Sequence, residues 1–391
     1  MIARIVITRP EFSAGEAEAI VRMLGEGAER VHIRKPGADE ADVEALVAAI
    51  PADLRPRLSI HDFAGVARRY GCGFHLNSRV PQRPEGIAGP LSRSCHSFSE
   101  LAQAEDVDYM FLSPVFDSIS KPGYGSRFST EELREAAGKG LINAKVYALG
   151  GVDPSRFAEL EALGFGGVAL LGAAWQPVDR EKFRLQFITQ GDGAEEIERE
   201  VRAALAGGCR WVQLRMKDAS AADIIAAAAR VQPLCAAAGA VFLLDDHVEL
   251  VETTRAHGVH LGKNDMPVDR ARAILGPGYI VGATANTFDD ISRNAALGAS
   301  YIGLGPLRFT TTKKNLSPVL GYEGYADILG RCREAGIQLP VVAIGGITPA
   351  DIAPLAECGV AGVAVSGAIS KAEDPSAAAL EFIKILKHKI S

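Results

Sequence analysis

One short segment of the chain combines an amide and two cations at a regular spacing. Gln213, Arg215 and Lys217 occupy alternate positions directly after an apolar run. In an extended chain alternate residues project to the same side, so this pattern predicts a small anion-binding surface. A guanidinium and an ammonium group side by side suit a diphosphate. A solvated, charged strand end is the alternative.

Carboxylates follow the next two apolar runs. Asp245 and Asp246 end the run that starts at Val241, and Asp265 lies five residues after His260. Mg²⁺ is bound in proteins through one or two carboxylates together with substrate phosphates. We therefore expect Asp246 and Asp265 to bind one Mg²⁺ ion. Helix N-capping is the alternative for either aspartate alone.

Hydroxyl groups, lysines and glycines follow the remaining apolar runs. Thr284 offers one hydroxyl, and the segment 305–314 contains three consecutive threonines followed by two lysines, among them Thr310, Thr312 and Lys313. This segment suits an anionic ligand, with a polar loop as the alternative. The pairs Gly345-Gly346 and Ser366-Gly367 expose backbone N–H groups, which are common phosphate ligands.

The apolar runs that precede these residues predict a barrel. They are short, rich in Val, Ile and Leu, and hardly alternate, as expected for parallel strands covered on both faces. Ala-rich helical segments such as 195–206 and 221–238 separate them. Eight βα units in about 200 residues fit a compact (β/α)8 barrel, in which functional residues follow the carboxyl ends of the strands. In the second half we expect strands near 185–189, 209–215, 240–244, 257–261, 279–283, 299–304, 340–344 and 361–365.

The two halves of the chain repeat each other in order. Val31-His-Ile-Arg34 matches Val212-Gln-Leu-Arg215, and Ile60-His-Asp62 matches Leu244-Asp-Asp246. The spacing between matching segments rises steadily from 181 residues (Thr8 and Thr189) to 195 (Gly167 and Gly362). An ordered series of this kind indicates a tandem duplication. The fold class we predict is therefore α/β, with two tandem TIM barrels at residues 1–177 and 184–391.

Composition limits the classes of partner. The chain has 391 residues, 48% of them apolar, and 48 acidic against 42 basic residues, so it is neither disordered nor a polyanion binder. It lacks an apolar run of about 18 residues that could cross a bilayer, and its six cysteines are scattered. We expect a reduced, cytoplasmic protein with small-molecule substrates and with neither nucleic acid nor membrane as partner. The sequence does not decide whether it forms a homo-oligomer.

Residues 185–391 closely resemble thiamine phosphate synthase. The resemblance covers nearly the whole second half and rests on the family motifs Q-x-R-x-K, an N/D-D pair, H-x-G-x-x-D, a hydroxyl residue after the fifth strand, G-P-x-x-x-T-x-T-K and G-G-I. It implies an enzyme that joins an aminopyrimidine methyl diphosphate to a thiazole phosphate (carboxylate) and releases pyrophosphate. Two departures are visible, because Asp245 replaces the usual Asn and Ser366 is shifted by one position.

The resemblance also implies a role for each motif residue. Asp246 and Asp265 would bind Mg²⁺, and Gln213, Asp245 and Ser366 would line the substrate site. The leaving diphosphate would contact Arg215, Lys217, Thr284 and Lys313, and the thiazole phosphate would contact Thr310, Thr312, Gly346 and Gly367. The expected mechanism is dissociative, because an electron-rich pyrimidine can bear a methylene cation once pyrophosphate leaves.

The first half has lost part of this pattern. Pro36 stands where Lys217 would be, with Lys35 adjacent, and no acid matches Asp265, so we expect a broken metal site beside intact glycine loops. The segment Ser94-Cys-His96-Ser97 looks like the S-x-H-S segment of the thiazole tautomerase branch of the same superfamily. The resemblance implies that His96 acts as acid and base, with Arg34 and Lys121 as anion contacts. A degenerate structural barrel is the alternative.

Two other functions compete with thiamine phosphate synthesis. One is a different phosphate-dependent barrel enzyme, such as an isomerase or a decarboxylase, and the Q-x-R-x-K and T-x-T-K motifs argue against it. The other is a non-catalytic sensor of thiamine precursors, which has no need of an intact pair of aspartates.

Overall fold

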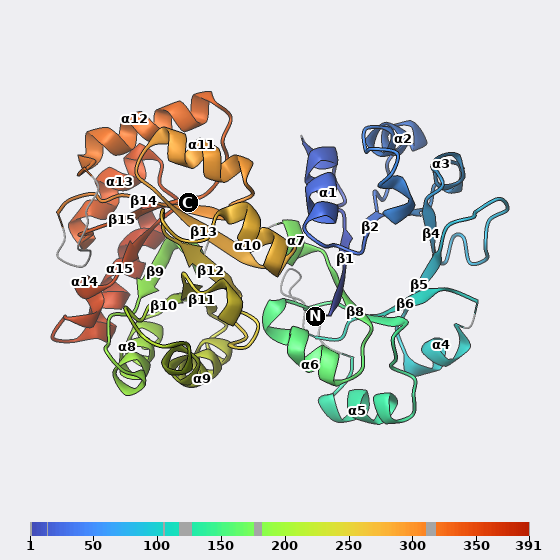
Figure 1. Ribbon diagram of the computed structural model, residues 1–391, viewed down its shortest axis with the longest axis horizontal. Coiled ribbons are helices and arrows are strands. Elements are labelled where there is room, and N and C mark those ends of the chain that lie inside the picture. The colour runs from blue at the N-terminus through green and yellow to red at the C-terminus, as the bar shows by residue number, and fades with distance from the viewer. Residues whose placement is uncertain are drawn as a thin grey trace. The chain divides into compact units, whose positions relative to one another are not determined.

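The computed structural model describes residues 2–13, 15–104, 106–116, 127–175, 182–309 and 318–390. The chain divides into two compact units, one of residues 1–177 with 275–278 and the other of residues 178–274 and 279–391. Each unit contains a closed barrel of eight parallel strands surrounded by helices (Figure 1). The predicted fold class, two tandem (β/α)8 barrels, is confirmed.

The first barrel runs from β1 to β8, and β1 pairs with β8 to close it. Its strands are β1 (Ala3–Ile7), β2 (Arg30–Ile33), β3 (Leu58–His61), β4 (Gly73–Leu76), β5 (Leu91–Cys95), β6 (Tyr109–Leu112), β7 (Val146–Leu149) and β8 (Gly167–Leu170). Its helices are α1 (Glu16–Gly25), α2 (Glu40–Ala48), η1 (Arg55–Arg57), α3 (Ala64–Tyr70), α4 (Phe98–Gln103), α5 (Thr130–Gly138), η2 (Pro154–Arg156), α6 (Phe157–Ala162) and α7 (Gly172–Trp175).

The second barrel runs from β9 to β16, and β16 pairs with β9 to close it. Its strands are β9 (Leu185–Ile188), β10 (Trp211–Leu214), β11 (Val241–Asp245), β12 (Gly258–Leu261), β13 (Ile280–Ala285), β14 (Tyr301–Leu304), β15 (Val341–Ile344) and β16 (Gly362–Val365). Its helices are η3 (Lys182–Arg184), α8 (Ala194–Ala206), α9 (Ala221–Ala237), η4 (Val248–Leu250), α10 (Val268–Leu275), α11 (Phe288–Ala296), α12 (Gly321–Glu334), η5 (Pro349–Asp351), α13 (Ile352–Cys358), α14 (Gly367–Ser370) and α15 (Pro375–Lys389).

The strands of the second barrel form where the apolar runs predict them, with ends displaced by one or two residues. In β10, expected over 209–215 and observed over Trp211–Leu214, both ends are displaced inward. Arg215 and Lys217 therefore lie beyond the strand, and Asp218 takes a positive φ of 56° in the turn that follows. The alternation of side chains between the two faces of the strand ends at Leu214. Lys217 therefore need not point to the same side as Gln213 and Arg215.

Side-chain caps and a buried core fix these elements in place. Ser220 and Thr287 begin α9 and α11 by accepting hydrogen bonds from the N–H groups of Asp223 and Asp290, an arrangement worth about 1 kcal/mol per helix. The core of the second barrel contains an apolar cluster of buried side chains. The cluster consists of Phe183, Trp211, Val241, Leu243, Ile280, Tyr301 and Val342.

Among the residues that the structure describes, no helix combines the length and the apolar character that crossing a bilayer requires.

Candidate active site

A cavity of about 860 Å³ opens at the carboxyl ends of the strands of the second barrel. Its wall combines cationic, carboxylate and amide side chains with glycine-rich loops, and it draws on segments that follow most of the strands. The polar lining residues include Gln186, Gln190, Gln213, Arg215, Asp245, Asp246, His260, Lys263, Asn264, Asp265, Thr284, Asn286, Thr348, Ser366 and Lys371.

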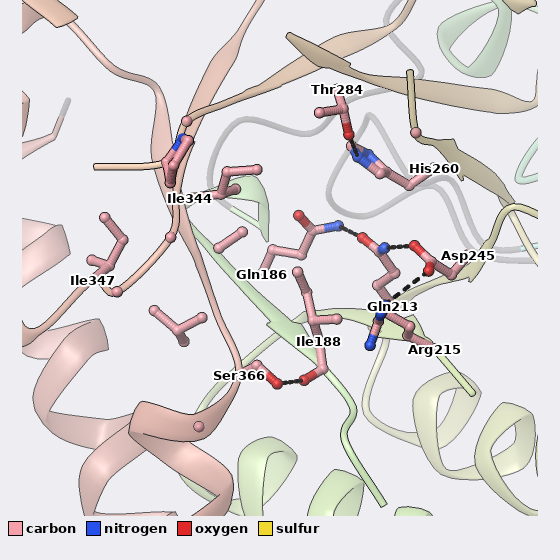
Figure 2. Close-up of a pocket in the computed structure, with 18 of the residues that line it drawn as sticks. Gln186, Ile188, Gln213, Arg215, Asp245, His260, Thr284, Ile344, Ile347 and Ser366 are labelled. Atoms are coloured by element: carbon pink, nitrogen blue, oxygen red, sulfur yellow. Dashed lines mark hydrogen bonds and ion pairs between the residues drawn. The ribbon is translucent and has the colours of Figure 1, made fainter. Parts of the chain in front are cut away.

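A chain of hydrogen bonds crosses the floor of this cavity and orients Arg215 (Figure 2). The amide of Gln186 donates to the carbonyl oxygen of Gln213 at 2.7 Å, and the amide of Gln213 donates to Asp245. The other oxygen of Asp245 lies 3.2 Å from Nε of Arg215. Because Asp245 holds Nε, the terminal nitrogens of the guanidinium remain directed at the cavity, where they can donate to an anion.

A second branch of the same network reaches Thr284. Tyr301 accepts from Gln186 at 3.1 Å and contacts Nδ1 of His260 at 2.8 Å, and Nε2 of His260 lies 3.0 Å from the Thr284 hydroxyl. All four side chains are buried. The network therefore holds the Thr284 hydroxyl in one orientation at the cavity wall (Figure 2).

Two further carboxylates form an acidic corner beside Arg215. Asp246 and Asp265 lie within hydrogen-bonding reach of each other, and Gly262 donates its N–H to Asp265 at 2.7 Å. A side chain at Gly262 would collide with the Asp265 carboxylate and lie within 3.9 Å of that of Asp246, which accounts for the glycine of the H-x-G-x-x-D motif.

The charges at this corner fit a divalent cation. Loss of hydration inside the cavity and the neighbouring carboxylates of Asp245 and Asp265 raise the pKa of Asp246. Asp246 also adopts a positive φ of 61°, which is uncommon for a residue with a side chain and aims its carboxylate at Asp265. Carboxylate oxygens crowded together in this way are the donor set that Mg²⁺ prefers.

Two lysines of the cavity wall were not among the predicted site residues. Lys263 lies 2.8 Å from Asp290, and Lys371 follows the short helix α14. Lys263 lies inside the H-x-G-x-x-D segment, two residues before Asp265, and this position could have suggested it. Lys371 has no signal of its own in the sequence, since it comes close to the other residues only when β16 closes the barrel against β9.

The loops after β15 and β16 place backbone groups and a hydroxyl at the opposite wall. Gly345 and Gly346 have positive φ values of 92° and 72°, and a Cβ at Gly346 would meet Arg308 at 2.5 Å. Ser366 donates its hydroxyl to the carbonyl of Ile188 at 2.5 Å, while Gly367 begins α14. The hydroxyl of Ser366 is thus used within the barrel, and the backbone remains to face the cavity.

Asp351 stabilises the loop after β15 through hydrogen bonds to Arg308 and Thr348. It accepts from Arg308 at 2.7 and 2.5 Å and from the N–H of Thr348 at 2.7 Å, and Arg308 also donates to the Gly346 carbonyl at 2.8 Å. Burial acts to raise the pKa of Asp351, but the hydrogen bonds from Arg308 and its neighbours outweigh burial and leave the pKa well below its usual range.

We expect Asp351→Asn to destabilise the second barrel by about 2 kcal/mol, because the half-exposed Arg308 loses its ion pair. A carboxyl whose pKa is lower in the folded state stabilises the fold above its unfolded pKa, near 4, and that contribution is lost as the pH falls further. Chemical denaturation of the two proteins from pH 7 down to pH 3 would measure this. The difference between them should shrink at the acid end, and a constant difference would contradict the assignment.

Several predicted contacts lie elsewhere or outside the described residues. Lys217 is exposed in the turn after β10, and it is not among the described residues that line the cavity. Thr310, Thr312 and Lys313 fall within residues 310–317, which the structure does not describe. Of the residues predicted from the sequence, the structure brings together Gln213, Arg215, Asp245, Asp246, Asp265, Thr284, Gly346, Ser366 and Gly367 at one cavity.

The corresponding place in the first barrel has a different charge arrangement. Asp62 adopts a φ of 69°, like Asp246, but both of its oxygens accept from Arg79 at 2.7 Å, and Asn77 donates to it as well. A carboxylate neutralised by a guanidinium is a poor ligand for Mg²⁺. Lys35, the cation nearest to the Lys217 position, is buried and bonded to Glu16 at 2.6 Å.

His96 lies exposed at the end of β5. Its Nδ1 is 2.8 Å from the Ser113 carbonyl, so Nδ1 carries the proton and the neutral ring has its lone pair on Nε2. Lys121, one of the two expected anion contacts, falls within residues 117–126, which the structure does not describe.

A cluster of three buried histidines in the first barrel was not predicted. His32, His61 and His75 come from β2, β3 and β4, and one ring nitrogen of each lies within 4.8 Å of the others. Burial is the main cause of their lowered pKa values, which for His75 is about 4. The rings are therefore neutral near pH 7.

The fold and the cavity by themselves define a class of protein. A (β/α)8 barrel that gathers a guanidinium, lysines, paired aspartates and glycine loops at the carboxyl ends of its strands belongs to the enzymes that act on phosphorylated small molecules.

The chain belongs to the thiamine monophosphate synthase family, whose model matches residues 4–174 and again residues 185–369. It is similar to the thiamine-phosphate synthase of Bacteroides thetaiotaomicron, with 54% identity over 52% of this chain and 97% of the relative. That of Bacteroides fragilis is 56% identical over 49% of this chain and 94% of its own length. The protein is therefore an enzyme, a transferase of thiamine biosynthesis.

Two further relatives extend the comparison. The thiamine biosynthesis bifunctional protein ThiM/ThiE of Symbiobacterium thermophilum is 37% identical over 97% of this chain and 81% of its own length. Among solved structures, thiamine phosphate pyrophosphorylase from Pyrococcus furiosus is 31% identical over 54% of this chain and 99% of its own, with a TM-score of 0.48.

Proposed function

We propose that the second barrel, residues 184–391, joins the pyrimidine and thiazole halves of thiamine phosphate. The C–O bond between the pyrimidine methylene and the diphosphate breaks, and both electrons leave with the diphosphate oxygen. The methylene carbocation that remains is stabilised by the electron-rich aminopyrimidine. The lone pair of the thiazole nitrogen then forms the new C–N bond, and the products are thiamine phosphate and pyrophosphate.

The observation that carries this proposal is the arrangement of charge in the cavity. Arg215, oriented by Asp245, lines the same cavity as the Thr284 hydroxyl and as Lys263, whose Nζ pairs with Asp290. Fixed donors aimed at a leaving group stabilise charge that develops only as the bond breaks, which is the main source of catalysis in such sites. A bound Mg²⁺ ion, held by Asp246 and Asp265, would neutralise part of the charge on the departing diphosphate.

The opposite wall suits the second substrate. Gly345, Gly346 and Gly367 line this wall of the cavity together with Lys371, and their backbone N–H groups carry no side chain of their own that would keep a ligand away. Such groups bind a phosphate monoester well. With the thiazole phosphate bound there and the diphosphate bound at Arg215, the thiazole nitrogen and the methylene carbon can meet between them, and no protein nucleophile is required.

Mixing the full-length protein with Mg²⁺, the pyrimidine diphosphate and the thiazole phosphate tests this function directly. We expect thiamine phosphate and pyrophosphate to form in equal amounts, and an electron-withdrawing substituent on the pyrimidine to slow the reaction. Tight binding of both substrates without turnover would instead indicate the sensor, and release of phosphate without C–N bond formation would contradict the proposed step.

For the first barrel we propose a thiazole tautomerase activity with His96 as acid and base. The free lone pair on Nε2 and the exposed position of the ring at a strand end support this role. We expect His96→Ala to lower conversion of the thiazole carboxylate tautomer by about 10²-fold and to leave thiamine phosphate synthesis intact. Conversion as fast as that of the wild type would show that His96 is not the base.

A further inference from the structure

We propose that His32, His61 and His75 form a binding site for one divalent transition-metal ion, such as Zn²⁺, inside the first barrel. The three side chains project from consecutive strands, and His61 and His75 are direct neighbours in the register of β3 and β4. One nitrogen of each ring lies within 4.8 Å of the other two. Around a tetrahedral ion with bonds of about 2.1 Å these nitrogens would be about 3.4 Å apart, so small side-chain rotations bring them into range.

The surroundings orient the ring of His32 as a metal ligand needs to be oriented. Nε2 of His32 lies 2.6 Å from the hydroxyl of Tyr109, which in turn lies 3.0 Å from the Ser59 hydroxyl. Nδ1 of His32 is thereby turned inward, where it shares a hydrogen bond of 2.9 Å with Nε2 of His61. To bind one ion, the two nitrogens exchange this hydrogen bond for metal bonds, and the proton that it holds moves to the other nitrogen of its ring. Histidine ligands in metal sites regularly hold the second ring nitrogen in a hydrogen bond of this kind.

His75 has its own polar supports. Its Nδ1 lies 2.8 Å from the Ser92 hydroxyl and its Nε2 lies 3.2 Å from that of Ser94. It stacks on His61 with the ring centroids 4.2 Å apart. To place its lone pair on the ion, His75 turns out of this stack and exchanges one serine hydrogen bond for a metal bond. The other serine remains to hold the ring.

The donor set selects the class of metal. The rings are neutral, as metal ligands must be. Asp62, the carboxylate that acts on His75, is engaged by Arg79 and Asn77, so the cluster offers imidazole nitrogens. Imidazole suits Zn²⁺, Co²⁺, Ni²⁺ and Cu²⁺, whereas Mg²⁺ prefers oxygen ligands.

The fold itself does not require histidine at these positions. In the second barrel the matching residues are Gln213, Asp245 and His260, which form a hydrogen-bonded network of amide, carboxylate and a single imidazole. Both barrels are closed, yet the side chains at these matching positions differ in chemical type. The histidines of the first barrel are a property of that barrel and give it a ligand preference that the second barrel lacks.

Titration of the metal-free, full-length protein with Co²⁺ in excess Mg²⁺ tests the inference. Mg²⁺ occupies oxygen-ligand sites, and visible absorption reports nitrogen-coordinated Co²⁺. We expect one Co²⁺ per chain, displaced by Zn²⁺. His32→Gln, which places the residue of the second barrel at this position, and His61→Asn should each weaken binding by at least about 100-fold. Tyr109→Phe should weaken it by about tenfold, because only the orienting hydroxyl is lost.

His388→Gln is the matched control, since His388 is exposed on α15, and it should bind Co²⁺ like the wild type. Circular dichroism and thermal melting of each variant establish that it folds. Absence of Co²⁺ binding by the wild type in excess Mg²⁺, or binding that survives both His32→Gln and His61→Asn, would overturn the proposal. The inference does not depend on the function proposed for the second barrel.

Discussion

Arg215→Ala is expected to lower kcat/KM for thiamine phosphate formation by about a thousandfold. Arg215 is the guanidinium that the hydrogen-bonded floor of the second barrel directs into the cavity, through Gln213 and Asp245. Its removal takes away charge stabilisation of the departing diphosphate and leaves the carboxylate of Asp245 facing the anion. Steady-state kinetics with both substrates varied would measure the loss.

Two variants separate this effect from a general loss of charge. Arg215→Lys keeps the cation but not the planar fork, so it should recover part of the activity. Arg230→Ala removes an exposed arginine that pairs with Glu198 in the same barrel, away from the cavity, and should retain wild-type kinetics. Near-normal synthesis by Arg215→Ala would contradict the placement of the diphosphate. From the sequence we expect Lys313→Ala to lower activity as much as Arg215→Ala does. Lys313 lies outside the residues that the structure describes.

The second large effect concerns the acidic corner. Asp246→Asn and Asp265→Asn should each lower activity by about 10²-fold and raise the Mg²⁺ concentration needed for half-maximal rate by at least about tenfold. Each change removes a charged oxygen ligand while keeping the shape of the side chain. Initial rates measured across a range of Mg²⁺ concentrations report both effects.

Asp245→Asn is the matched control for these two variants. Asp245 is next in sequence to Asp246, but its oxygens already accept from Gln213 and pair with Arg215. An amide at this position still accepts from Gln213, so the Mg²⁺ requirement should stay close to that of the wild type. If Asp245→Asn raised the Mg²⁺ requirement as much as Asp246→Asn does, the ion would have to lie deeper in the cavity than proposed.

The sequence predicted the barrels and most of the cavity because both depend on order along the chain. Each strand of a parallel barrel is a short apolar run, and the residue after it lies at the carboxyl end by construction. The proximity of Asp246 to Asp265 therefore follows from their positions after two successive strands. Lys217 shows the limit of this reasoning: β10 ends at Leu214, so strand alternation no longer decides where the side chain of Lys217 lies, and Lys217 is not among the described residues that line the cavity.

The histidine cluster shows a different limit. His32, His61 and His75 each stand alone in an apolar strand, without the close spacing that marks a metal-binding motif. A single histidine in an apolar strand is normally predicted to be part of the hydrophobic core. The three become one site only because β2, β3 and β4 lie side by side and their inward positions share a layer. Whether Lys35 faces a substrate or Glu16 is likewise decided by side-chain packing.

The backbone kink at Asp62 and Asp246 has a consequence for how duplicated enzymes diverge. Both aspartates keep the same left-handed conformation, yet one is neutralised by Arg79 while the other stands beside a second acid. At this position divergence has preserved the conformation of the main chain and changed the residues around the carboxylate. One arginine is therefore enough to change the charge beside this carboxylate without rebuilding the main chain, and the same backbone can support a different charge arrangement in each barrel.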